Sequence, residues 1–510
     1  MTIEAVLVEI AQGAWNGGKV VDNSIFENKG MFFKGNIPVT NKTIEERVGV
    51  RTRVAALPEE RIGVSAVENL LETSDIDTSR IRLVIGATNV GEDKYDPGPL
   101  IKYPFDVLRS HSPNALVFDL YAGCPGYNVA VELDFMLSLS GFLKTGDITV
   151  IVGAENIHRA QAFRPHDTAH IIFGDDALAT AFETRVHLAP KGKCESIHAP
   201  AFSVERDLLS EIAGKIFSLV GTDRIDGMIV DNQLGKLEHR IPAVAARIQH
   251  HLVERIYPDQ AKQGAFQRFK DALDFYDRYV RSFAFDIMTL EGDPEVVQHI
   301  AKAYVKSGKY KTVVSIFLSR DMEVKITLHS GSGFVFEPPA KGVVDTLTQT
   351  HGCFADYIRV IQEKSDVFGE MDGKGVFLYA TRGASAHLNR LLSRNRLSLD
   401  TIDLLIEHQA NFAMIPMTLE QVFNGTYPDA KKAAADFIAT KMVTNIHMRG
   451  NCSVVCMQRL PYDLRRGVLQ SDMIQGYAVN KNIHNLRNAK TILRDSVGAG
   501  MTRSSFLQRL

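Results

Sequence analysis

The feature that most constrains the fold is an apolar strand, a tight corner and an apolar helix in direct succession. Residues 115–123 form an apolar run that predicts a buried strand, and residues 125–144 follow it with apolar side chains at helical spacing. Two further buried strands are predicted at 81–89 and 148–156. A strand, a helix and a strand in this order make a parallel βαβ unit. We therefore predict an α/β protein whose parallel or mixed sheet is covered by helices.

The corner between that strand and that helix carries a cysteine. Cys124 lies between Gly123 and Pro125, and proline suits the first position of a helix because its missing N–H would be unpaired there. This places Cys124 at the helix N-cap, where free N–H groups and the positive end of the helix dipole favour a thiolate. Free cysteines are more often packed as small hydrophobes. From this corner alone, Cys124 can be interpreted either as a thiol packed in the core or as a nucleophile.

Composition excludes several classes of protein. The chain has 510 residues, a formal net charge of −2 and five cysteines. The near-neutral charge predicts no general attraction to nucleic acid or to a membrane surface. Five scattered cysteines argue against a disulfide framework, and no basic start with a long apolar run indicates a signal peptide or a spanning helix. We expect a cytoplasmic protein that binds neither nucleic acid nor membrane.

No metal site is predicted either. Residues 166–170 place two histidines four apart, but this stretch lacks the glutamate that a zinc-protease helix carries between them. Cys452 and Cys456 are also four apart, without companion histidines or cysteines at zinc-binding spacing.

The pattern along the chain predicts three parts. Residues 1–202 hold the cysteine corner, residues 203–360 read as an inserted α/β subdomain, and residues 361–510 return to long helices and buried strands. Within the insertion, strands are predicted at 225–232, 311–319 and 324–330. The last part begins with a predicted helix at 373–398, followed at 401–415 by a strand that runs into a short loop.

Two more corners carry polar residues of catalytic types. His408 and Asn411 follow an apolar strand, and Asn451 follows Gly450 at a similar corner. In α/β folds, ligands bind at the carboxyl ends of strands, and a cysteine nucleophile needs a base or a hydrogen-bond donor near it. A lone histidine is more often structural and a Gly-Asn pair is usually a turn. Three such corners in one chain nevertheless predict a common site formed by Cys124, His408 and Asn451.

These segments resemble the ketoacyl-acyl-carrier-protein synthase III group of the thiolase superfamily. The stretch YAGCPGYNVAVEL is similar to the active-cysteine elbow of that group, IEHQAN to its histidine motif and RGNCSVV to its asparagine motif. Further similar segments are EERVGVRTR (45–53), IIFGDDALATAF (171–182), MDGKGVFLYATR (371–382) and DSVGAGMTRSSFLQRL (495–510). The resemblance covers residues 1–200 and 365–510. It implies a thiolase-like αβαβα five-layer sandwich with an inserted α/β subdomain, and a homodimer.

The resemblance also implies a reaction. Cys124 would take an acyl group from a thioester, and His408 and Asn451 would donate hydrogen bonds to the oxygen of a second, malonyl or β-ketoacyl, thioester. The enolate of the second substrate would attack the acyl-cysteine. The backbone N–H of Cys124 and one from the loop of Gly498 and Gly500 would form the oxyanion hole. Substrates would arrive on coenzyme A or on the phosphopantetheine of an acyl carrier protein, with no bound cofactor.

The resemblance also suggests residues that would bind the substrate or its carrier. The resemblance makes Arg51 and Asn411 candidates for binding the substrate or its carrier. Arg390 and Arg394, on the predicted helix at 373–398, could form a docking patch for a carrier protein. A solvated helix face is the simpler interpretation of these two arginines.

Departures from the family pattern narrow the range of functions that the resemblance implies. The only tryptophan is Trp15, so the arginine segment lacks the tryptophan that stacks adenine in relatives that load acyl-coenzyme A. Ala413 stands where the enzymes that start fatty-acid elongation carry an arginine, and Pro125 and Tyr127 are unusual beside the cysteine. A biosynthetic thiolase would need a cysteine in the loop where this chain has Met501. These departures favour a specialised condensing enzyme of secondary metabolism.

Two alternatives stay open. One is a ketosynthase/cyclase that joins two acyl chains into a dialkylresorcinol or stilbene-type ring. The other is a non-condensing acyltransferase on the same scaffold. The presence of all three candidates, Cys124, His408 and Asn451, argues against a catalytically silent chain.

Overall fold

The N-terminal part forms five neighbouring strands of a large mixed sheet, called here the N-terminal series. The computed structural model describes residues 4–92, 98–185, 193–204, 207–332, 336–363 and 366–510, apart from the side chains of Glu238 and Ser332. The strands of this series lie in the order β1-β9-β8-β6-β7. They are β1 (Leu7–Ala14), β6 (Ile81–Ala87), β7 (Leu116–Tyr121), β8 (Ile148–Glu155) and β9 (Asp176–Thr184). The three strands predicted in this region are confirmed as β6, β7 and β8, and β6 runs parallel to both of its neighbours.

Helix α4 (Gly126–Leu139) is the helix predicted after the cysteine corner, and all of its residues are buried. It begins later than predicted: the N-cap is Pro125, so the expectation that Cys124 is the N-cap is wrong by one residue. The cause is a turn in which the N–H of Gly126 donates to the carbonyl of Gly123, before the first helical bond to Pro125. The helix also ends earlier than predicted, because the chain turns at Gly141, which has a φ of 73°.

The C-terminal part forms a second, four-stranded sheet in the order β16-β23-β22-β19. Its strands are β16 (Gly342–Thr350), β19 (Leu404–Glu407), β22 (Thr491–Gly498) and β23 (Thr502–Arg509). Strand β16 falls within the predicted insertion, so this sheet takes its first strand from before residue 361. The strand predicted at 401–415 is only four residues long, because the chain leaves the sheet at His408.

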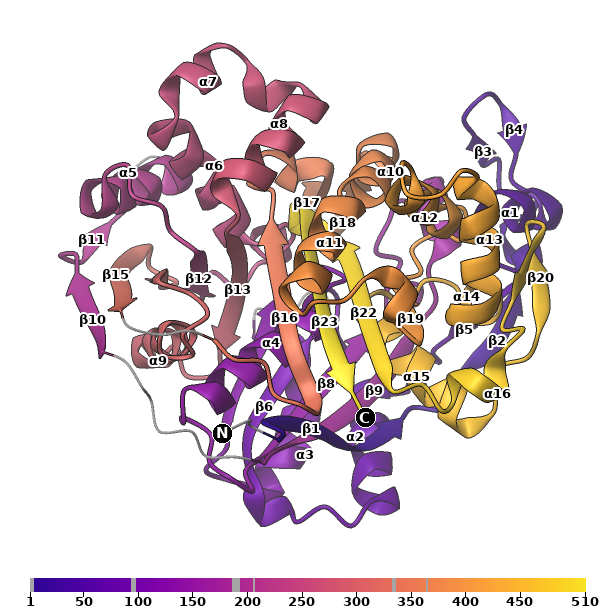
Figure 1. Ribbon diagram of the computed structural model, residues 1–510, viewed down its shortest axis with the longest axis horizontal. Helices are drawn as coiled ribbons and strands as arrows, with labels where there is room; N and C mark the ends of the chain where they lie inside the picture. Colours follow the sequence, from indigo (N-terminus) through magenta and orange to yellow (C-terminus); the bar gives the residue numbers. More distant parts are fainter. Residues whose placement is uncertain (1–3, 93–97, 186–192, 205–206, 333–335, 364–365) are drawn as a thin grey trace.

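Helices lie between the two sheets and on both outer faces (Figure 1). Helices α4 and α15 (Cys456–Arg466) contact both sheets, α2 (Ile62–Thr73) contacts the larger sheet, and α11 (Ala384–Arg394) contacts the smaller one. This order of layers confirms the predicted αβαβα sandwich. The helix predicted at 373–398 is two helices, α10 (Gly373–Arg382) and α11, which meet at Gly383.

Residues 193–332, which begin ten residues before the predicted insertion and include most of it, do not form a sheet of their own. Their main strands are β10 (Lys193–His198), β12 (Gly227–Asn232), β13 (Phe283–Thr289), β14 (Thr312–Leu318) and β15 (Glu323–Ser332). Strand β13 pairs antiparallel with β7, so the five strands extend the N-terminal series into one eleven-stranded sheet that includes β11 (Phe202–Ser203). The main helices of the segment are α5 (Leu208–Val220), α6 (Val244–Ile256) and α9 (Pro294–Lys306). Figure 1 shows this segment, in magenta to salmon, beside the yellow and orange C-terminal sheet.

The chain also has further α-helices, and strand pairs that lie outside the two sheets. They are α1 (Asn41–Val48), α3 (Lys102–His111), α7 (Pro258–Lys262), α8 (Phe269–Phe275), α12 (Met414–Phe423), α13 (Ala430–Lys441), α14 (Ile446–Arg449) and α16 (Ile483–Leu486), with the strand pairs β2 (Lys19–Asp22) and β5 (Thr52–Ala55), β3 (Phe32–Phe33) and β4 (Ile37–Pro38), β17 (Ile358–Glu363) and β18 (Asp366–Met371), and β20 (Asp472–Ile474) and β21 (Tyr477–Val479). Within the part of the chain that the structure describes, no helix has the length and the apolar character that crossing a membrane requires.

Candidate active site

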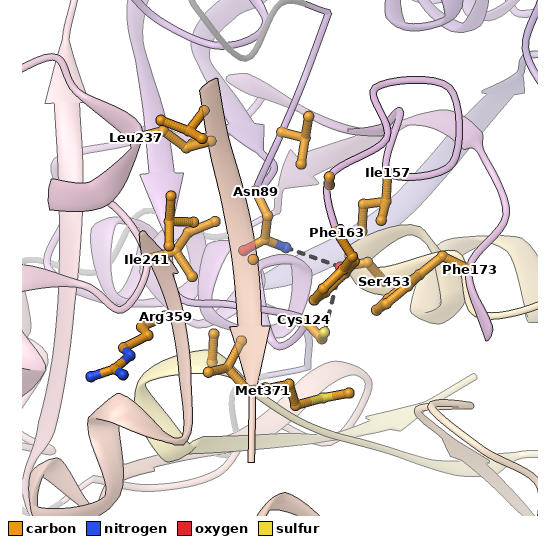
Figure 2. Close-up of a pocket in the computed structure, with 17 residues that line it drawn as sticks. Asn89, Cys124, Ile157, Phe163, Phe173, Leu237, Ile241, Arg359, Met371 and Ser453 are labelled. Carbon is orange, nitrogen blue, oxygen red and sulfur yellow. Dashed lines mark hydrogen bonds between the residues drawn. The ribbon is translucent and has the colours of Figure 1, made fainter. Parts of the chain in front are cut away.

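The cysteine corner opens onto an apolar pocket with about 660 Å³ of space between its atoms, part of it open to solvent. Figure 2 shows Cys124 at one end of this pocket, with Phe163 and Phe173 on one side and Leu237 and Ile241 on the other. The remaining lining side chains come mostly from the β17–β18 hairpin and from the loops that follow β6 and β8. The polar groups are concentrated around the thiol.

Two glycines allow the C-terminal loop to pack against Cys124. Gly123 has a φ of 69°, and a Cβ added there would lie 2.5 Å from the backbone nitrogen of Ala499. A Cβ on Gly498 would lie 2.5 Å from the backbone nitrogen of Cys124. The loop predicted to supply an oxyanion-hole donor is therefore in direct contact with the corner through Gly498. Gly500, with a φ of 77°, faces Ala246 and Thr502 rather than Cys124.

His408 is held beside the thiol by the end of strand β19. Its backbone N–H donates to the carbonyl of Asp495 on β22 at 2.8 Å, and the side chain is buried. Neither ring nitrogen bonds to an oxygen or nitrogen atom of the described structure, and the sulfurs of Cys124 and Cys456 are its neighbours. Burial opposes a charged ring, but these two sulfurs outweigh it and raise the pKa of His408 to about 10. A buried ring placed beside a thiol in this way is suited to exchanging a proton with it or with a ligand.

Asn451 is fixed by the turn before strand β9. Its N–H donates to the carbonyl of Ile172 at 2.7 Å, and the N–H of Gly174 donates to the carbonyl of Asn451 at 3.1 Å. The side-chain Oδ1 of Asn451 accepts the N–H of Ser453 at 2.8 Å and the thiol of Cys456 at 3.9 Å. With its oxygen engaged in this way, the amide presents its nitrogen as the donor to a ligand.

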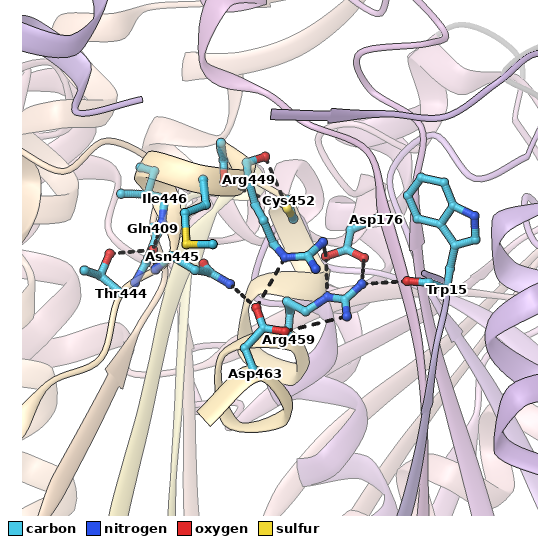
Figure 3. Close-up of polar contacts among 12 residues, drawn as sticks. Trp15, Asp176, Gln409, Thr444, Asn445, Ile446, Arg449, Cys452, Arg459 and Asp463 are labelled. Atoms are coloured by element: carbon cyan, nitrogen blue, oxygen red, sulfur yellow. Dashed lines mark hydrogen bonds and ion pairs between the residues drawn. The ribbon is translucent and has the colours of Figure 1, made fainter. Parts of the chain in front are cut away.

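A buried ion-pair network ties helix α15 to strand β9 (Figure 3). Arg459 pairs with Asp176 at 2.6 Å, and Arg449 lies 3.3 Å from Asp463 and 3.6 Å from Asp176. Burial alone would raise the pKa of Asp176, but Arg459 and Arg449 hold it below its usual value. Because Asn451 lies between Arg449 and Arg459 in sequence, this network fixes the position of the asparagine loop.

A second set of bonds joins the histidine and asparagine segments. The side-chain Oε1 of Gln409 accepts the backbone N–H groups of Asn445 and Ile446 at 3.1 and 2.8 Å, at the start of the short helix that precedes Asn451. Gln409 is the neighbour of His408 in the chain. Cys124 lines the pocket, whereas His408 and Asn451 are not among its described lining residues. His408 lies beside the sulfurs of Cys124 and Cys456, and Asn451 contacts Ser453, which lines the pocket next to Cys124.

Three polar residues at the thiol were not predicted. Ser453 Oγ lies 3.4 Å from Cys124 Sγ and 3.3 Å from Glu155 Oε1, and Asn89 Nδ2 donates to Ser453 Oγ at 2.9 Å. Burial raises the pKa of Glu155 to about 8, against the hydrogen bonds that it accepts from Asn89, Val90 and Ser453. Asn89 and Glu155 lie at the carboxyl ends of the strands predicted at 81–89 and 148–156. That position was the signal in the sequence that would have found them.

Cys456 is a second thiol at the site. It is the first residue of α15, it is buried, and it contacts Asn451. Burial opposes ionisation, but Cys452 and His408 lower the pKa of the Cys456 thiol. The sequence signal was a cysteine at the start of a helix, the environment that led to the choice of Cys124. Among the described residues, no group of three or more His, Cys, Asp or Glu side chains is arranged to hold a metal ion.

Arg51 and Asn411 do not line the pocket. Arg51 forms ion pairs with Glu45 at 2.6 Å and with Asp472 on β20 at 2.5 Å, which raise the pKa of its guanidinium. The side-chain oxygen of Asn411 accepts the N–H of Ala413 at 3.0 Å, in the turn that leads into α12. Both side chains have structural partners in this arrangement.

Arg390 and Arg394 also bind within the protein. Arg390 donates to the side chain of Gln349 at 2.8 Å, and Arg394 makes a two-pronged ion pair with the buried carboxylate of Asp345 at 2.6 and 2.9 Å. Both partners belong to β16, so these arginines fasten helix α11 to the smaller sheet.

Comparisons with known proteins agree with the resemblance in the sequence. No family model matches the chain. It is 26% identical over 245 residues to the β-ketoacyl-[acyl-carrier-protein] synthase III of Blochmanniella floridana. These matched residues cover 45% of this chain and 68% of that protein. It is 24% identical over 231 residues to the enzyme of the same name from Helicobacter pylori, covering 41% and 61%. The matched part thus spans about two thirds of these relatives or less.

The fold is shared with solved structures. The chain superposes on 3-oxoacyl-[acyl-carrier-protein] synthase III from Aquifex aeolicus with a TM-score of 0.53 and 15% identity, over 99% of this chain and 100% of that one. The synthase III of Thermus thermophilus gives a TM-score of 0.53 and 16% identity, over 99% of both chains. The comparisons confirm the resemblance to the synthase III group and the thiolase-type fold.

Proposed function

We propose that the chain is a condensing enzyme of the ketoacyl synthase III type, with Cys124 as the residue that carries the acyl group. One observation supports this above the others. Cys124 lines an apolar pocket and lies next to the ring of His408, which holds its proton because the sulfurs of Cys124 and Cys456 raise its pKa to about 10 against burial. A nucleophilic sulfur, an adjacent proton-carrying ring and an apolar cavity are what acyl transfer from a thioester needs.

In the first half-reaction, the Cys124 thiolate attacks the carbonyl carbon of an acyl thioester. The donor is coenzyme A or the phosphopantetheine arm of an acyl carrier protein. A new carbon–sulfur bond forms, the bond to the donor's sulfur breaks, and the leaving thiolate takes the proton held by His408. Backbone N–H groups of Cys124 and of the loop at Gly498 and Gly500 stabilise the negative oxygen of the intermediate.

In the second half-reaction, a malonyl thioester enters beside the acyl-cysteine. The ring of His408 and the amide nitrogen of Asn451 donate hydrogen bonds to its thioester oxygen, and carbon dioxide leaves as the enolate forms. The enolate carbon attacks the acyl carbonyl, so that a carbon–carbon bond forms and the bond to Cys124 breaks. Removal of one such donor typically costs roughly a hundredfold to a thousandfold in kcat. With a β-ketoacyl partner no carbon dioxide leaves, and the enolate forms when the carbon between the two carbonyls gives a proton to the ring of His408, which the first half-reaction left neutral.

The lining of the pocket supports an apolar acyl chain as the group on Cys124. Its walls include Ile157, Phe163, Leu237, Ile241 and Val360, so each methylene that enters leaves water for an apolar surface. Such a transfer is worth about 0.8 kcal/mol per methylene. A chain of several carbons is therefore preferred to acetyl.

A specialised role fits the chain better than fatty-acid initiation. Trp15 is buried and its indole N–H donates to Glu60, so it takes no part in binding a nucleotide at the pocket. Ala413 provides no charge beside the histidine motif. The missing tryptophan favours an acyl donor other than coenzyme A, such as a carrier protein, and the two departures together favour a role in secondary metabolism. The ring-forming variant, in which a second acyl chain is joined and cyclised, differs from the linear reaction in its product.

The proposal is tested by offering the enzyme an acyl donor together with a malonyl or β-ketoacyl carrier. We expect release of carbon dioxide from the malonyl group and a product whose mass equals the sum of the two acyl parts after that loss. A product lighter by one further water indicates ring closure. Acylation of Cys124 with no carbon–carbon bond to any partner would establish the non-condensing acyltransferase instead. Cys194→Ala, which removes a half-buried cysteine on β10, is the control and retains full activity.

A further inference from the structure

The strands of residues 193–332 repeat the topology of residues 7–184. The N-terminal series has the order β7-β6-β8-β9-β1, and the inserted series has the order β13-β12-β14-β15-β10. In both, the second strand in the chain is parallel to the third and the fourth, and the fifth strand is antiparallel to the fourth and the first. Chain order, sheet order and strand direction all agree, strand for strand.

The helices repeat as well. One helix precedes the second strand (α2 and α5), one follows it (α3 and α6), and one follows the third strand (α4 and α9). The first two helices of each series contact each other, as α2 with α3 and α5 with α6. The third helices, α4 and α9, contact each other. The two series therefore have the same layered arrangement.

A short sequence match marks the equivalent strands. A Phe-Asp-aliphatic triplet occupies 118–120 in β7 and 285–287 in β13. Both aspartates are buried, and burial raises the pKa of Asp119 and of Asp286 to about 7. Asp119 accepts a backbone N–H from just before α3, and Asp286 accepts those of the first two residues of α6 at 2.8 Å. The same carboxylate thus tethers the same helix start in each series.

The two series are joined as two copies of one chain would be. Leu120 pairs with Ile287, Asp119 with Met288 and Tyr121 with Asp286. When the two triplets are superposed, Asp119 corresponds to Asp286 and Tyr121 to Met288. The pair Asp119–Met288 is therefore the same pair as Asp286–Tyr121 with the two strands exchanged. Such reciprocal pairing is the mark of a two-fold, isologous contact. Both edges of β7 are occupied within the chain, and a homodimer would have to form through another surface.

The second series has lost the nucleophile. Where Cys124 and Pro125 follow β7, Asp293 and Pro294 follow β13. The carboxylate of Asp293 accepts the N–H of Glu295 at 2.8 Å and caps α9, as a residue at that position in an ordinary helix does. This corner carries no sulfur and cannot form a thioester.

The second series instead contributes to the pocket of the first. The loop between β12 and α6 carries Leu237 and Ile241 into the wall opposite Phe163 (Figure 2). The same loop is anchored to the first series by Arg240, whose guanidinium donates to the carbonyl of Gly98 at 2.7 Å and lies 5.3 Å from the centre of the Tyr121 ring.

We infer that residues 193–332 are a nucleophile-free second copy of the N-terminal unit that serves as a built-in partner. It occupies the β7 edge and supplies one wall of the acyl pocket within the same chain. Leu237 and Ile241 thereby set the length of the acyl chain that Cys124 accepts. The acyl part of this inference rests on the proposed function, so its test needs a readout that does not depend on catalysis.

The first experiment measures the rate at which N-ethylmaleimide and N-dodecylmaleimide alkylate Cys124. Leu237→Trp and Ile241→Trp are expected to slow the dodecyl reagent by about tenfold or more relative to the ethyl reagent, because bulk is added to a packed wall. Ile197→Trp, on the exposed face of β10, is the control and leaves the ratio unchanged. If either wall variant is unfolded by circular dichroism, Leu237→Ala replaces it and shifts the ratio toward the dodecyl reagent. An unchanged ratio in folded wall variants overturns the inference, whether or not the wild type condenses acyl groups.

The second experiment decides whether the wall is supplied within one chain. Wild-type protein is mixed with an excess of the double variant Cys124→Ala, Leu237→Trp, and alkylation is followed on the wild-type Cys124 alone. A wall from the same chain leaves the wild-type ratio of the two reagents constant at every mixing ratio. A ratio that falls with excess variant shows that a second chain supplies the wall, and overturns the inference.

Discussion

Ser453 is the residue whose removal most sharply tests the electrostatics of the thiol. Its hydroxyl lies 3.4 Å from Cys124 Sγ and 3.3 Å from Glu155 Oε1, so its single proton has two acceptors. When Cys124 is a thiolate, the hydroxyl donates to sulfur. When Cys124 carries an acyl group, the thioester sulfur accepts poorly and the proton turns to Glu155.

The magnitude follows from the cost of losing a hydrogen bond to a charge. Such a bond is worth about 1.5–3 kcal/mol, and about 1.4 kcal/mol corresponds to a factor of ten. Because the acceptor is a large sulfur and the proton is shared with Glu155, the lower end applies. Ser453→Ala should therefore slow the alkylation of Cys124 at a fixed pH by about tenfold.

The assay is the rate at which iodoacetamide alkylates Cys124, measured for wild type and variant at the same fixed pH. Ser496→Ala is the matched control, since Ser496 is buried on β22 and its hydroxyl has no hydrogen-bond partner in the described structure. A rate for Ser453→Ala equal to that of the wild type would refute the reasoning.

Three further predictions concern the residues around the site. His408→Ala is expected to lower condensation by roughly a hundredfold or more, with a smaller loss in Cys124 acylation, and separate assays of the two half-reactions check this split. Glu155 has a folded pKa of about 8 against 4.5 for an ordinary glutamate, so its ionisation destabilises the fold. The stability that the neutral carboxyl of Glu155 contributes to the fold is fully present below pH 4.5 and is lost as the pH rises through about 8. Glu155→Gln should therefore lose less stability than the wild type between pH 5 and pH 8, by on the order of a few kcal/mol, as measured by urea unfolding. Arg459→Met leaves the carboxylate of Asp176 without its main partner and should cost about 3–5 kcal/mol of unfolding free energy. Lys432→Met, which breaks an exposed ion pair with Asp436, is the control and should leave the unfolding free energy almost unchanged.

The sequence could predict which corners carry candidate polar residues, because each corner is a short local pattern. A buried strand, a turn and a polar residue of catalytic type follow one another at Cys124, at His408 and at Asn451. The carboxyl ends of such strands meet at one edge of a sheet. The same reasoning, applied to the ends of the strands at 81–89 and 148–156, would also have identified Asn89 and Glu155.

The nature of the insertion was not predictable in this way. Strand β10 consists mostly of polar residues that are exposed or half-buried, so no apolar run marks it as a strand. Strand β13 follows an aromatic helical stretch that hides its beginning, and its pairing with β7 joins residues far apart in sequence. Only the Phe-Asp-aliphatic triplet is shared by the two equivalent strands, and three residues are too few to indicate a repeat. Sheet order and strand direction carry the information that local pattern lacks.

Arg390 and Arg394 show why charged residues on a helix are poor guides to a docking surface. The pattern on the helix could not show that β16 would present Gln349 and the buried carboxylate of Asp345 to them. Partners of this kind are set by tertiary packing.

The central claim is that Cys124 carries the acyl group, and the intact mass of the protein tests it most directly. After incubation with acyl-coenzyme A or an acyl carrier protein, the wild type should gain the mass of one acyl group. The adduct should be located on Cys124, and it should be absent from Cys124→Ala and retained in Cys456→Ala, which removes the neighbouring thiol. An adduct that persists in Cys124→Ala, or none in the wild type with any donor, would contradict the account.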